Sequence, residues 1–307
     1  MGKKALITGA TSYIAVALIK RILSNNIYSD VYAVIRPNSP NRRKIPRDDR
    51  IHLIELKMSE YKKLLFLKTA EIDVWYHFAW EGVRGTARED GTMQKQNQLA
   101  SMDCINCAVA MEIPCFIGIG SQAEYGEVRE RMHEELLPAP TTAYGKAKMQ
   151  VCNYGIKVCQ RTKTRFVWAR IFSVYGCGEN KNTLLMSAIE KMSKDLPIAL
   201  SPCEHLWNYI YLEDAVQALY LLGDCSATAG IYNIASDDTR ALKEFVLELK
   251  ELLSSNSVLE FGAISYGEKI PYGIQPDIEK IKRELNWKPR YSFKQGVAEI
   301  RKNWGEK

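Results

Sequence analysis

The sequence predicts an α/β fold built on a doubly wound parallel sheet, followed by a smaller C-terminal lobe. Three observations lead to this prediction. The chain has 307 residues, of which 46% are hydrophobic and 25% charged, and this is ample material for a large apolar core. Apolar runs of strand length alternate with helical patterns through the first half of the chain. Strands that are separated by helices imply right-handed crossovers, and therefore parallel neighbours.

The first half of the chain supplies the sheet and the helices that cover it. Its predicted strands are continuously apolar, as expected where both faces of a sheet are covered. They lie at Lys4–Thr8, Asp30–Ile35, Ile51–Leu56, Asp73–His77, Cys115–Ile119 and Arg165–Ile171. The helices expected between them are Tyr13–Leu23, Asp90–Met111 and Ala143–Arg161.

The rhythm changes after Gly176, where connections lengthen and carry Gly, Pro and Asn. We therefore divide the chain into a sheet-bearing domain, residues 1–176, and a smaller lobe, residues 177–307, with later segments returning to the first domain. Shorter elements are expected at Trp207–Leu212, Glu213–Leu222, Gly230–Ile234, Leu242–Leu253, Asp277–Leu285 and Ser292–Trp304. Ligands of doubly wound sheets bind outside the carboxyl ends of the strands, so we expect a cleft between the two units.

Charge and composition exclude several classes of protein. The net charge of +6 is mild, and without a basic run or an aromatic-basic stripe we expect no nucleic-acid partner. No run of 18 apolar residues exists, so no membrane span is expected. Residues 1–4 resemble the start of a signal peptide, but Thr8, Thr11 and Ser12 interrupt the apolar stretch that follows. We therefore expect a cytoplasmic protein.

Cys104 and Cys107 form a C-x-x-C pair within a helical pattern, with no second pair and no nearby histidine. Metal binding and redox chemistry need such partners, so we expect no metal and interpret the eight cysteines as buried free thiols.

Residues 8–15 join the first strand to the first helix and read T-G-A-T-S-Y-I-A. Such a turn directs backbone N–H groups and a helix N-terminus at a pyrophosphate, although a purely structural connection uses similar residues. It resembles the T-G-x-x-G-x-x-G turn of the extended short-chain dehydrogenases/reductases, which are Rossmann-type enzymes. Ser12 and Ala15 replace the second and third glycines, and serine is a departure because close approach to phosphate favours glycine. The resemblance implies cofactor contacts for Gly9, Thr11, Ser12, Tyr13 and Ile14.

The end of the second strand indicates which dinucleotide binds. Arg36 stands where NAD enzymes usually place an acidic residue for the ribose 2′-OH, and Arg42 and Arg43 follow. Guanidinium groups suit a 2′-phosphate, so we expect NADP (as NADPH), with NAD as the alternative. Asp30 lies too early in the strand to reach the ribose, so no carboxylate is expected there. A solvated basic loop would also explain these arginines.

Further cofactor contacts are implied by the resemblance. Lys57-Met58 occupies the place where the family has an aspartate followed by an apolar residue beside the adenine. Residues 77–80 read H-F-A-W and are similar to the family's H-x-A motif, in which we interpret His77 as a packed structural residue. These matches add Met58, Phe78, Ala79 and Trp80 to the expected cofactor site. The resemblance also implies cofactor contacts for Asn97 and Ile171.

Tyr144 and Lys148 are spaced i, i+4, so they share one face of the helix expected there. A free tyrosine has a pKa near ~10, and a nearby ammonium lowers the pKa toward the working range of a proton donor. Upstream, residues 120–126 read G-S-Q-A-E-Y-G and resemble the family's S-x-x-x-Y-G segment. The resemblance implies a catalytic set of Ser121, Tyr144 and Lys148, in which Tyr144 and Lys148 also contact the cofactor.

The resemblance continues along the chain. Residues 170–176 are similar to R-x-x-N-V-Y-G, and residues 208–214 to the family's D-F-V-Y-V-x-D, with Trp207 in place of a preceding arginine. It implies that the long helices at Asp90–Met111 and Ala143–Arg161 pair in a homodimer, unless they merely cover the sheet. The implied substrate contacts are Ser121, Gln122, Ala123, Tyr144, Ser173, Trp207 and Asn208.

The segment after Ser121 separates the reactions of the NAD-dependent epimerase/dehydratase family. Dehydratases typically carry Asp-Glu there as acid and base, and this chain has Gln122-Ala123, with Glu124 one position late. We therefore expect NADPH-dependent reduction of a nucleotide-linked 4-keto-6-deoxyhexose. A 4-epimerase with tightly bound NAD is the alternative. A non-catalytic binding protein of the same family is disfavoured by the intact catalytic set, and a lack of NADPH turnover would revive it.

Overall fold

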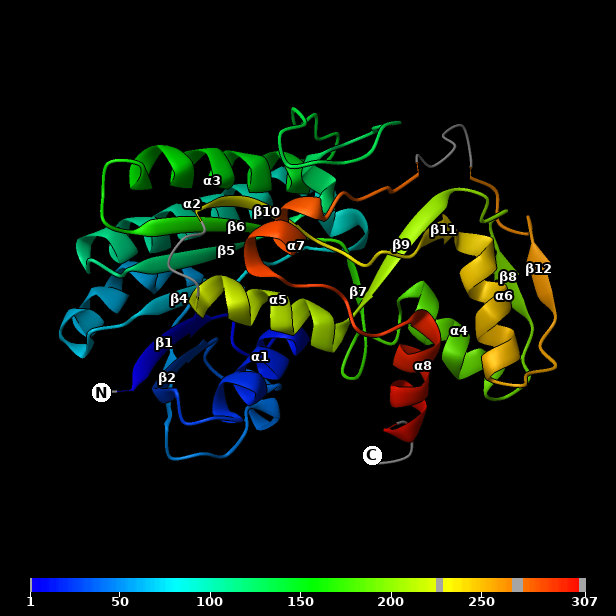
Figure 1. Cartoon of the computed structure of the whole chain (residues 1–307), viewed down its shortest axis with the longest axis horizontal. Coiled ribbons are helices and arrows are strands. Elements are labelled where there is room, and N and C mark those ends of the chain that lie inside the picture. Colours follow the sequence, from blue (N-terminus) through cyan, green and yellow to red (C-terminus); the bar gives the residue numbers. More distant parts are fainter. Residues whose placement is uncertain (1, 225–228, 267–272, 304–307) are drawn as a thin grey trace.

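A computed structural model describes residues 2–224, 229–266 and 273–303. Its main sheet has seven parallel strands in the order β10-β6-β5-β4-β1-β2-β3 (Figure 1). This confirms the doubly wound α/β fold. The strands are β1 (Lys3–Thr8), β2 (Tyr28–Ile35), β3 (Ile51–Glu55), β4 (Val74–His77), β5 (Cys115–Ser121), β6 (Arg165–Ile171) and β10 (Gly230–Ile234).

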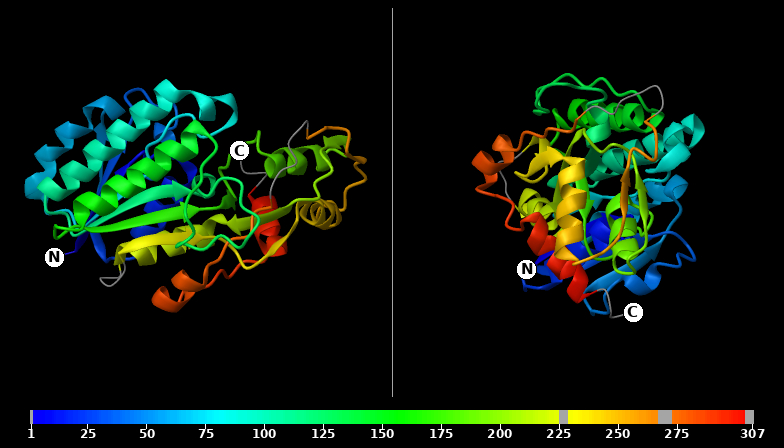
Figure 2. Two further views of the ribbon diagram at one scale, coloured as in Figure 1. Left: turned by 90° about the horizontal axis from the view of Figure 1, so that it is seen from above. Right: turned by 90° about the vertical axis from the view of Figure 1, so that its right-hand side faces the viewer.

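Both faces of the main sheet are covered, which explains why its strands read as unbroken apolar runs. Successive side chains of a strand point to opposite faces, so Ala5 and Ile7 pack under α1 (Tyr13–Leu23) and α5 (Leu212–Asp224). Leu6 points the other way, into a core formed with α2 (Gly91–Ala110), α3 (Ala143–Cys159) and the 3₁₀ segment η2 (Met58–Ala70). The two long helices α2 and α3 lie side by side across that face (Figure 2).

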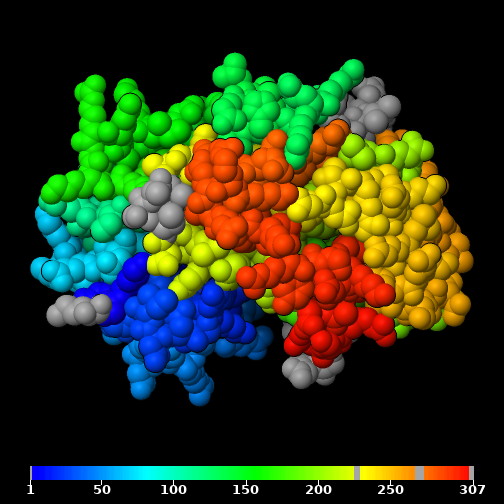
Figure 3. All heavy atoms as spheres, viewed as in Figure 1, coloured from blue at the N-terminus to red at the C-terminus, as the bar shows by residue number. Residues whose placement is uncertain are grey.

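The other end of the molecule holds a third core, around Phe245 and Phe293. Figure 3 shows α7 and α8, in orange and red, in the middle of one face, between the blue N-terminal elements and the yellow α6. The helices of this end are α4 (Leu184–Met192), α6 (Leu242–Leu252) and α8 (Phe293–Lys302), while α7 (Glu279–Leu285) lies beside β10. Its small sheets pair β11 (Thr239–Ala241), β9 (Leu206–Tyr211) and β7 (Ser173–Tyr175), and β12 (Leu259–Phe261) with β8 (Ile198–Leu200).

Differences from the expected elements have local causes. Asp90, expected as the first helical residue, instead caps α2, and its carboxylate accepts the N–H of Met93 at 2.9 Å. β5 runs two residues further than expected, to Ser121. The sequence analysis missed η2 and α4, and the predicted helix end at Trp304 lies outside the described residues.

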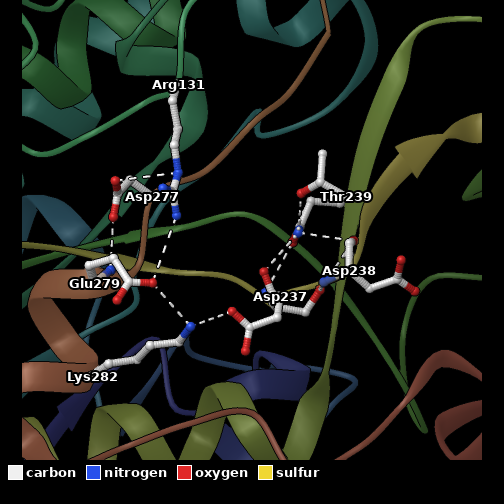
Figure 4. A network of polar contacts seen from close by, with 9 residues as sticks. Arg131, Asp237, Asp238, Thr239, Asp277, Glu279 and Lys282 are labelled. Carbon is white, nitrogen blue, oxygen red and sulfur yellow. Dashed lines mark hydrogen bonds and ion pairs between the residues drawn. The ribbon is translucent and has the colours of Figure 1, made fainter.

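A polar network braces the segment between β10 and β11 against α7 (Figure 4). Lys282 forms ion pairs with Asp237 and Glu279, and Arg131 from a distant loop reaches Asp277 at 3.3 Å. Three separate stretches of chain, at residues 131, 237 and 277–282, are thereby held together.

Two further features concern composition. Cys104 and Cys107 are free thiols on the buried side of α2, and burial raises the pKa of each. Within residues 2–224, 229–266 and 273–303, every helix is too short or too polar to cross a bilayer.

Candidate active site

The direction of strand order reverses between β1 and β4, and the two segments that leave these strands meet there. Gly9 follows β1 with φ +72°, a conformation that glycine adopts freely. A Cβ atom on Gly9 would lie 2.5 Å from the backbone nitrogen of Ala79, which follows β4. Gly9 and the H-x-A segment are therefore packed backbone against backbone at the point where doubly wound sheets bind their ligands.

Ser12 occupies the second glycine position of the turn without strain. Its backbone is extended, with φ −68° and ψ 150°, so glycine is not required for conformation. Its hydroxyl caps α1 by accepting the N–H of Ala15 at 3.3 Å. Thr11, Tyr13 and Ile14 are partly exposed around this helix N-terminus. Their contact with a phosphate stays a prediction.

A cavity of about 720 Å³ lies where β2 and β3 end, and Arg36, Met58 and Asn97 are among its lining residues. The structure also places a carboxylate there, which corrects the expectation that none is near. Glu81 Oε1 lies 3.1 Å from Arg36 Nη1, and its backbone N–H and C=O are held by the Asn97 amide at 3.0 and 2.8 Å. Sequence reasoning missed Glu81 because it considered acids of the second strand only, whereas Glu81 arrives from the end of β4.

His77 is a structural residue in this geometry. Its Nδ1 lies 2.7 Å from Thr8 Oγ1 and its Nε2 lies 2.9 Å from Ser101 Oγ. Burial lowers the pKa of His77 to about 3, so the ring stays neutral at ordinary pH. Three residues later Trp80 donates to Gln94 at 2.8 Å, and this bond fixes the indole beside α3.

The predicted catalytic set converges where β5 and the N-terminal turns of α3 meet. Gly145 makes this possible, because a Cβ at that position would lie 2.4 Å from the carbonyl oxygen of Ala123. The helix therefore approaches the turn after β5 closely enough for Ser121 to affect the pKa of Tyr144. Lys148 lies one turn further along α3, and its Nζ donates to the Ile119 carbonyl at 2.6 Å.

Lys148 is enclosed by protein. Its Nζ lies 3.6 Å from the ring centroid of Trp80 and 5.8 Å from that of Tyr144. Burial lowers the pKa of Lys148 to about 7, with the charge of Glu124 acting in the opposite direction.

The sequence led us to expect a lowered pKa for Tyr144, and the structure gives the opposite direction. Burial raises the pKa of Tyr144, and the hydrogen bond with Ser121 and the charge of Arg88 oppose that rise. The Lys148 ammonium donates to the Ile119 carbonyl and lies over the Trp80 ring.

A buried charge pair supports the turn that carries Ser121. Glu124 is 0% exposed, accepts the Ser121 N–H at 2.8 Å and pairs with Arg170 at 2.9 Å. The Trp168 indole donates to the same carboxylate at 2.9 Å. Sequence analysis noted only that Glu124 stands one position too late for a dehydratase acid or base, and did not connect it with Arg170, the arginine of the R-x-x-N-V-Y-G motif.

The residues predicted to contact the substrate differ in whether their polar atoms are already hydrogen-bonded within the protein. Gln122 Oε1 and Trp207 Nε1 are buried polar atoms without a hydrogen-bond partner among the described residues. Asn208 is 0% exposed, and its amide is occupied by the loop before β11, at 2.9 Å from the Ser236 carbonyl. Asn208 therefore holds that loop, and substrate contact by Asn208, Ser173 and Ala123 stays a prediction.

Comparison with known proteins decides the family. The model of the NAD dependent epimerase/dehydratase family matches residues 5–235. The chain belongs to this family. The match starts in β1 and ends just after β10, so it includes every strand of the main sheet and all three residues of the catalytic set.

Two curated members of the epimerase/dehydratase family with similar sequences are reductases. dTDP-4-dehydro-6-deoxyglucose reductase of Escherichia coli is 25% identical over 183 residues, which are 58% of this chain and 57% of the relative. GDP-6-deoxy-D-mannose reductase of Pseudomonas aeruginosa is 23% identical over 202 residues, 62% of this chain and 65% of the relative. The chain thus spans less than two thirds of the length of either relative.

Known structures resemble the whole fold. UDP-glucuronic acid 4-epimerase of Bacillus cereus, in complex with UDP-glucuronic acid and NAD, has a TM-score of 0.83 with 22% identity and 97% of each chain covered. UDP-glucose 4-epimerase of Thermotoga maritima, with UDP-glucose, has a TM-score of 0.85 with 18% identity and 99% of each chain covered. At these identities the likeness establishes the shared fold.

The residues of this chain fit a dinucleotide. The Gly9 turn leaves no room for a side chain, α1 begins at its end, and the cavity beside Arg36 lies where β2 and β3 end. Arg36, Met58 and Asn97 would hold the adenosine half, and Tyr144 and Lys148 would lie at the reactive half.

Proposed function

We propose that this protein reduces the 4-keto group of a nucleotide-linked 4-keto-6-deoxyhexose, such as a dTDP- or CDP-linked sugar, using NADPH. The observation that supports this most is the absence of a free acid on the described turn after Ser121. Gln122 and Ala123 cannot exchange protons, and the Glu124 carboxylate is occupied by Arg170 and Trp168. Removal of water would need an acid and a base there, whereas carbonyl reduction needs only one proton donor.

The proposed mechanism uses the catalytic set directly. When bound, the reduced dinucleotide supplies a hydride to the carbonyl carbon. The Ser121 and Tyr144 hydroxyls hydrogen-bond the carbonyl oxygen, and Tyr144 transfers its proton as negative charge develops on that oxygen. The Glu124–Arg170 pair fixes the Ser121 backbone, so the two hydroxyls are oriented before the substrate arrives.

Arg36 supports the choice of NADPH. It is 62% exposed at its side chain and lines the cavity beside the ends of β2 and β3, where its guanidinium can bind a 2′-phosphate. Binding would separate Arg36 from Glu81, an exposed pair that contributes little by itself.

A 4-epimerase with retained NAD is the second candidate, and Glu81 is the observation that favours it. A carboxylate in the adenosine cavity can accept a hydrogen bond from a ribose 2′-OH and repels a 2′-phosphate. Which of Arg36 and Glu81 dominates therefore separates the two functions.

Mass spectrometry of reactions with NADPH and a panel of nucleotide-linked keto-sugars tests the proposal. We expect a product two mass units heavier for at least one 4-keto-6-deoxyhexose, together with loss of NADPH absorbance. An isomerised product without net NADPH consumption would replace the reductase by the epimerase. No turnover on any sugar would favour the non-catalytic alternative.

We also propose a homodimer formed through α2 and α3. These neighbouring helices present apolar side chains to solvent, including Leu99 at 52% exposure and Ile156 at 41%. Light scattering at micromolar concentration should give twice the mass of the chain, and a monomer there would contradict the proposal.

A further inference from the structure

Arg88 lies against the catalytic tyrosine. Its guanidinium carbon is 5.0 Å from the ring centroid of Tyr144, closer than the Lys148 ammonium at 5.8 Å. Arg88 belongs to the 3₁₀ turn η3 (Gly85–Glu89), which the sequence analysis did not predict. Of these two cations, the one nearer the ring therefore comes from outside the Ser–Tyr–Lys set.

The backbone around Arg88 is held in place from both sides. Gln94 of α2 donates to the Ala87 carbonyl at 3.0 Å. Ala143 is the first residue of the helix that carries Tyr144, and its N–H donates to the Glu89 carboxylate at 3.2 Å. These bonds tie η3 to both long helices, so the position of Arg88 beside Tyr144 is a built feature of the site.

The guanidinium of Arg88 has no competing partner among the described residues. It forms no hydrogen bond or ion pair with them, and its Nε is buried without an acceptor. Arg84, four residues earlier in the same loop, instead pairs with Glu179 at 3.5 Å. An unpaired buried donor is costly, and a cation is attracted to an aromatic ring, most of all when the ring carries negative charge.

We infer that Arg88 is a positioning residue that stabilises the phenolate which Tyr144 becomes when it gives up its proton. In the reduction step the Tyr144 O–H bond breaks, the proton bonds to the carbonyl oxygen, and the phenolate retains the electron pair. Solvent returns a proton to Tyr144 after the product leaves. The inference rests on the proposed role of Tyr144 as proton donor.

The other charged groups near Tyr144 are less suited than Arg88 to stabilise its phenolate. Glu124, from the turn after β5, raises the pKa of Tyr144, and the ion pair with Arg170 offsets its charge. Lys148, on the helix of Tyr144 itself, is directed at Ile119 and is only partly charged near neutral pH, because burial lowers its pKa to about 7. Arg88 lies nearer the Tyr144 ring than Lys148 does.

A titration of the single phenol at position 144 tests the inference without any substrate. Tyr144 is replaced by 3-fluorotyrosine in the full chain, and its ¹⁹F chemical shift is followed against pH. A fluorinated phenol is more acidic, which keeps the titration below denaturing pH. We expect Arg88→Gln to raise the midpoint by roughly one pH unit or more, as for loss of an opposite charge at this distance.

Two variants make the outcome decisive. Arg88→Lys keeps the charge on a shorter side chain, so its midpoint should lie between wild type and Arg88→Gln, and this comparison suffices if the Gln variant does not fold. Arg84→Gln removes an arginine from the same loop and should leave the midpoint in place. An unchanged midpoint in Arg88→Gln, or an equal rise in Arg84→Gln, would overturn the inference. Because the titration needs no turnover, it can succeed even if the proposed reduction fails.

Discussion

The candidate site has a catalytic end around Tyr144 and an adenosine end around Arg36. The charged side chains of these two ends differ in how deeply they are buried and how they are paired. At the catalytic end Glu124, Arg170 and Lys148 are between 0 and 4% exposed. The Glu124 carboxylate accepts hydrogen bonds from the Ser121 N–H at 2.8 Å and from Arg170 Nε at 2.9 Å. At the adenosine end the side chains of Arg36 and Glu81 are 62% and 46% exposed and meet in one ion pair. Breaking a buried ion pair strongly lowers the free energy of unfolding, whereas an exposed pair contributes little to it. We therefore expect the catalytic end to keep a fixed geometry. At the adenosine end, contacts with a ligand can replace the exposed Arg36–Glu81 pair with little loss of free energy.

Tyr144→Phe tests the catalytic end with the largest expected effect. Loss of the hydroxyl removes the proton donor, so kcat should fall roughly 10²–10⁴-fold while the protein remains folded. Tyr154→Phe is the matched control, since Tyr154 lies on the same helix and its hydroxyl bonds Asn106 at 2.7 Å. Steady-state kinetics and circular dichroism measure both. Unchanged turnover in Tyr144→Phe would remove the proposed mechanism.

Glu124→Ala tests whether the catalytic end is fixed by its buried pair. Arg170 would be left as an uncompensated buried charge, so we expect a loss of about 3–5 kcal/mol of unfolding free energy. Glu190→Ala removes a solvent-accessible carboxylate that pairs with Lys194 at 3.1 Å, and should change the free energy of unfolding little. Urea denaturation of both variants gives the comparison. Equal losses would mean that burial of the pair does not matter.

Lys148 gives the catalytic end a characteristic pH dependence. Burial lowers the pKa of Lys148 to about 7, below the value of the unfolded chain, so between these values the unfolded state binds the extra proton. The free energy of unfolding should therefore rise with pH through this window, by up to about 1.4 kcal/mol per pH unit, and be lowest below pH 7.

The measurement for Lys148 is the difference between wild type and Lys148→Met in denaturant titrations from pH 6 to pH 10. The variant should lack the rise. Lys146→Met, an exposed lysine on the same helix, should retain it. A parallel course for wild type and Lys148→Met would mean that Lys148 stays charged in the folded protein.

The adenosine end should respond by a smaller, selective amount. Arg36→Ala should weaken NADPH binding about tenfold and leave NADH little changed, since one charge-assisted contact is lost. Glu81→Gln removes the competing carboxylate, so it should strengthen NADPH and weaken NADH. Isothermal titration with both cofactors measures the pair. Equal affinities in the wild type, or NAD that copurifies and does not exchange, would move the preference to the epimerase.

Sequence reasoning succeeded where the signal is local. The helix Tyr13–Leu23 was predicted to the residue, because its amphipathic pattern lies within those residues. The i, i+4 spacing of Tyr144 and Lys148 likewise needs only a helix. The 3₁₀ segments η2 and η3 have no such periodic pattern, and both were missed.

The sequence by itself determined the doubly wound sheet and placed the turn at Gly9, because both depend on periodicity or on residues close together in the chain. Through its resemblance to a known family it also indicated the candidate set of Ser121, Tyr144 and Lys148. Only the tertiary structure decided which charged side chains meet. Glu124 meets Arg170, Arg36 meets Glu81 and Arg88 meets Tyr144 across separations of 45 to 56 residues. No local pattern encodes such contacts, because they follow from how crossovers place the ends of different strands and helices beside one another.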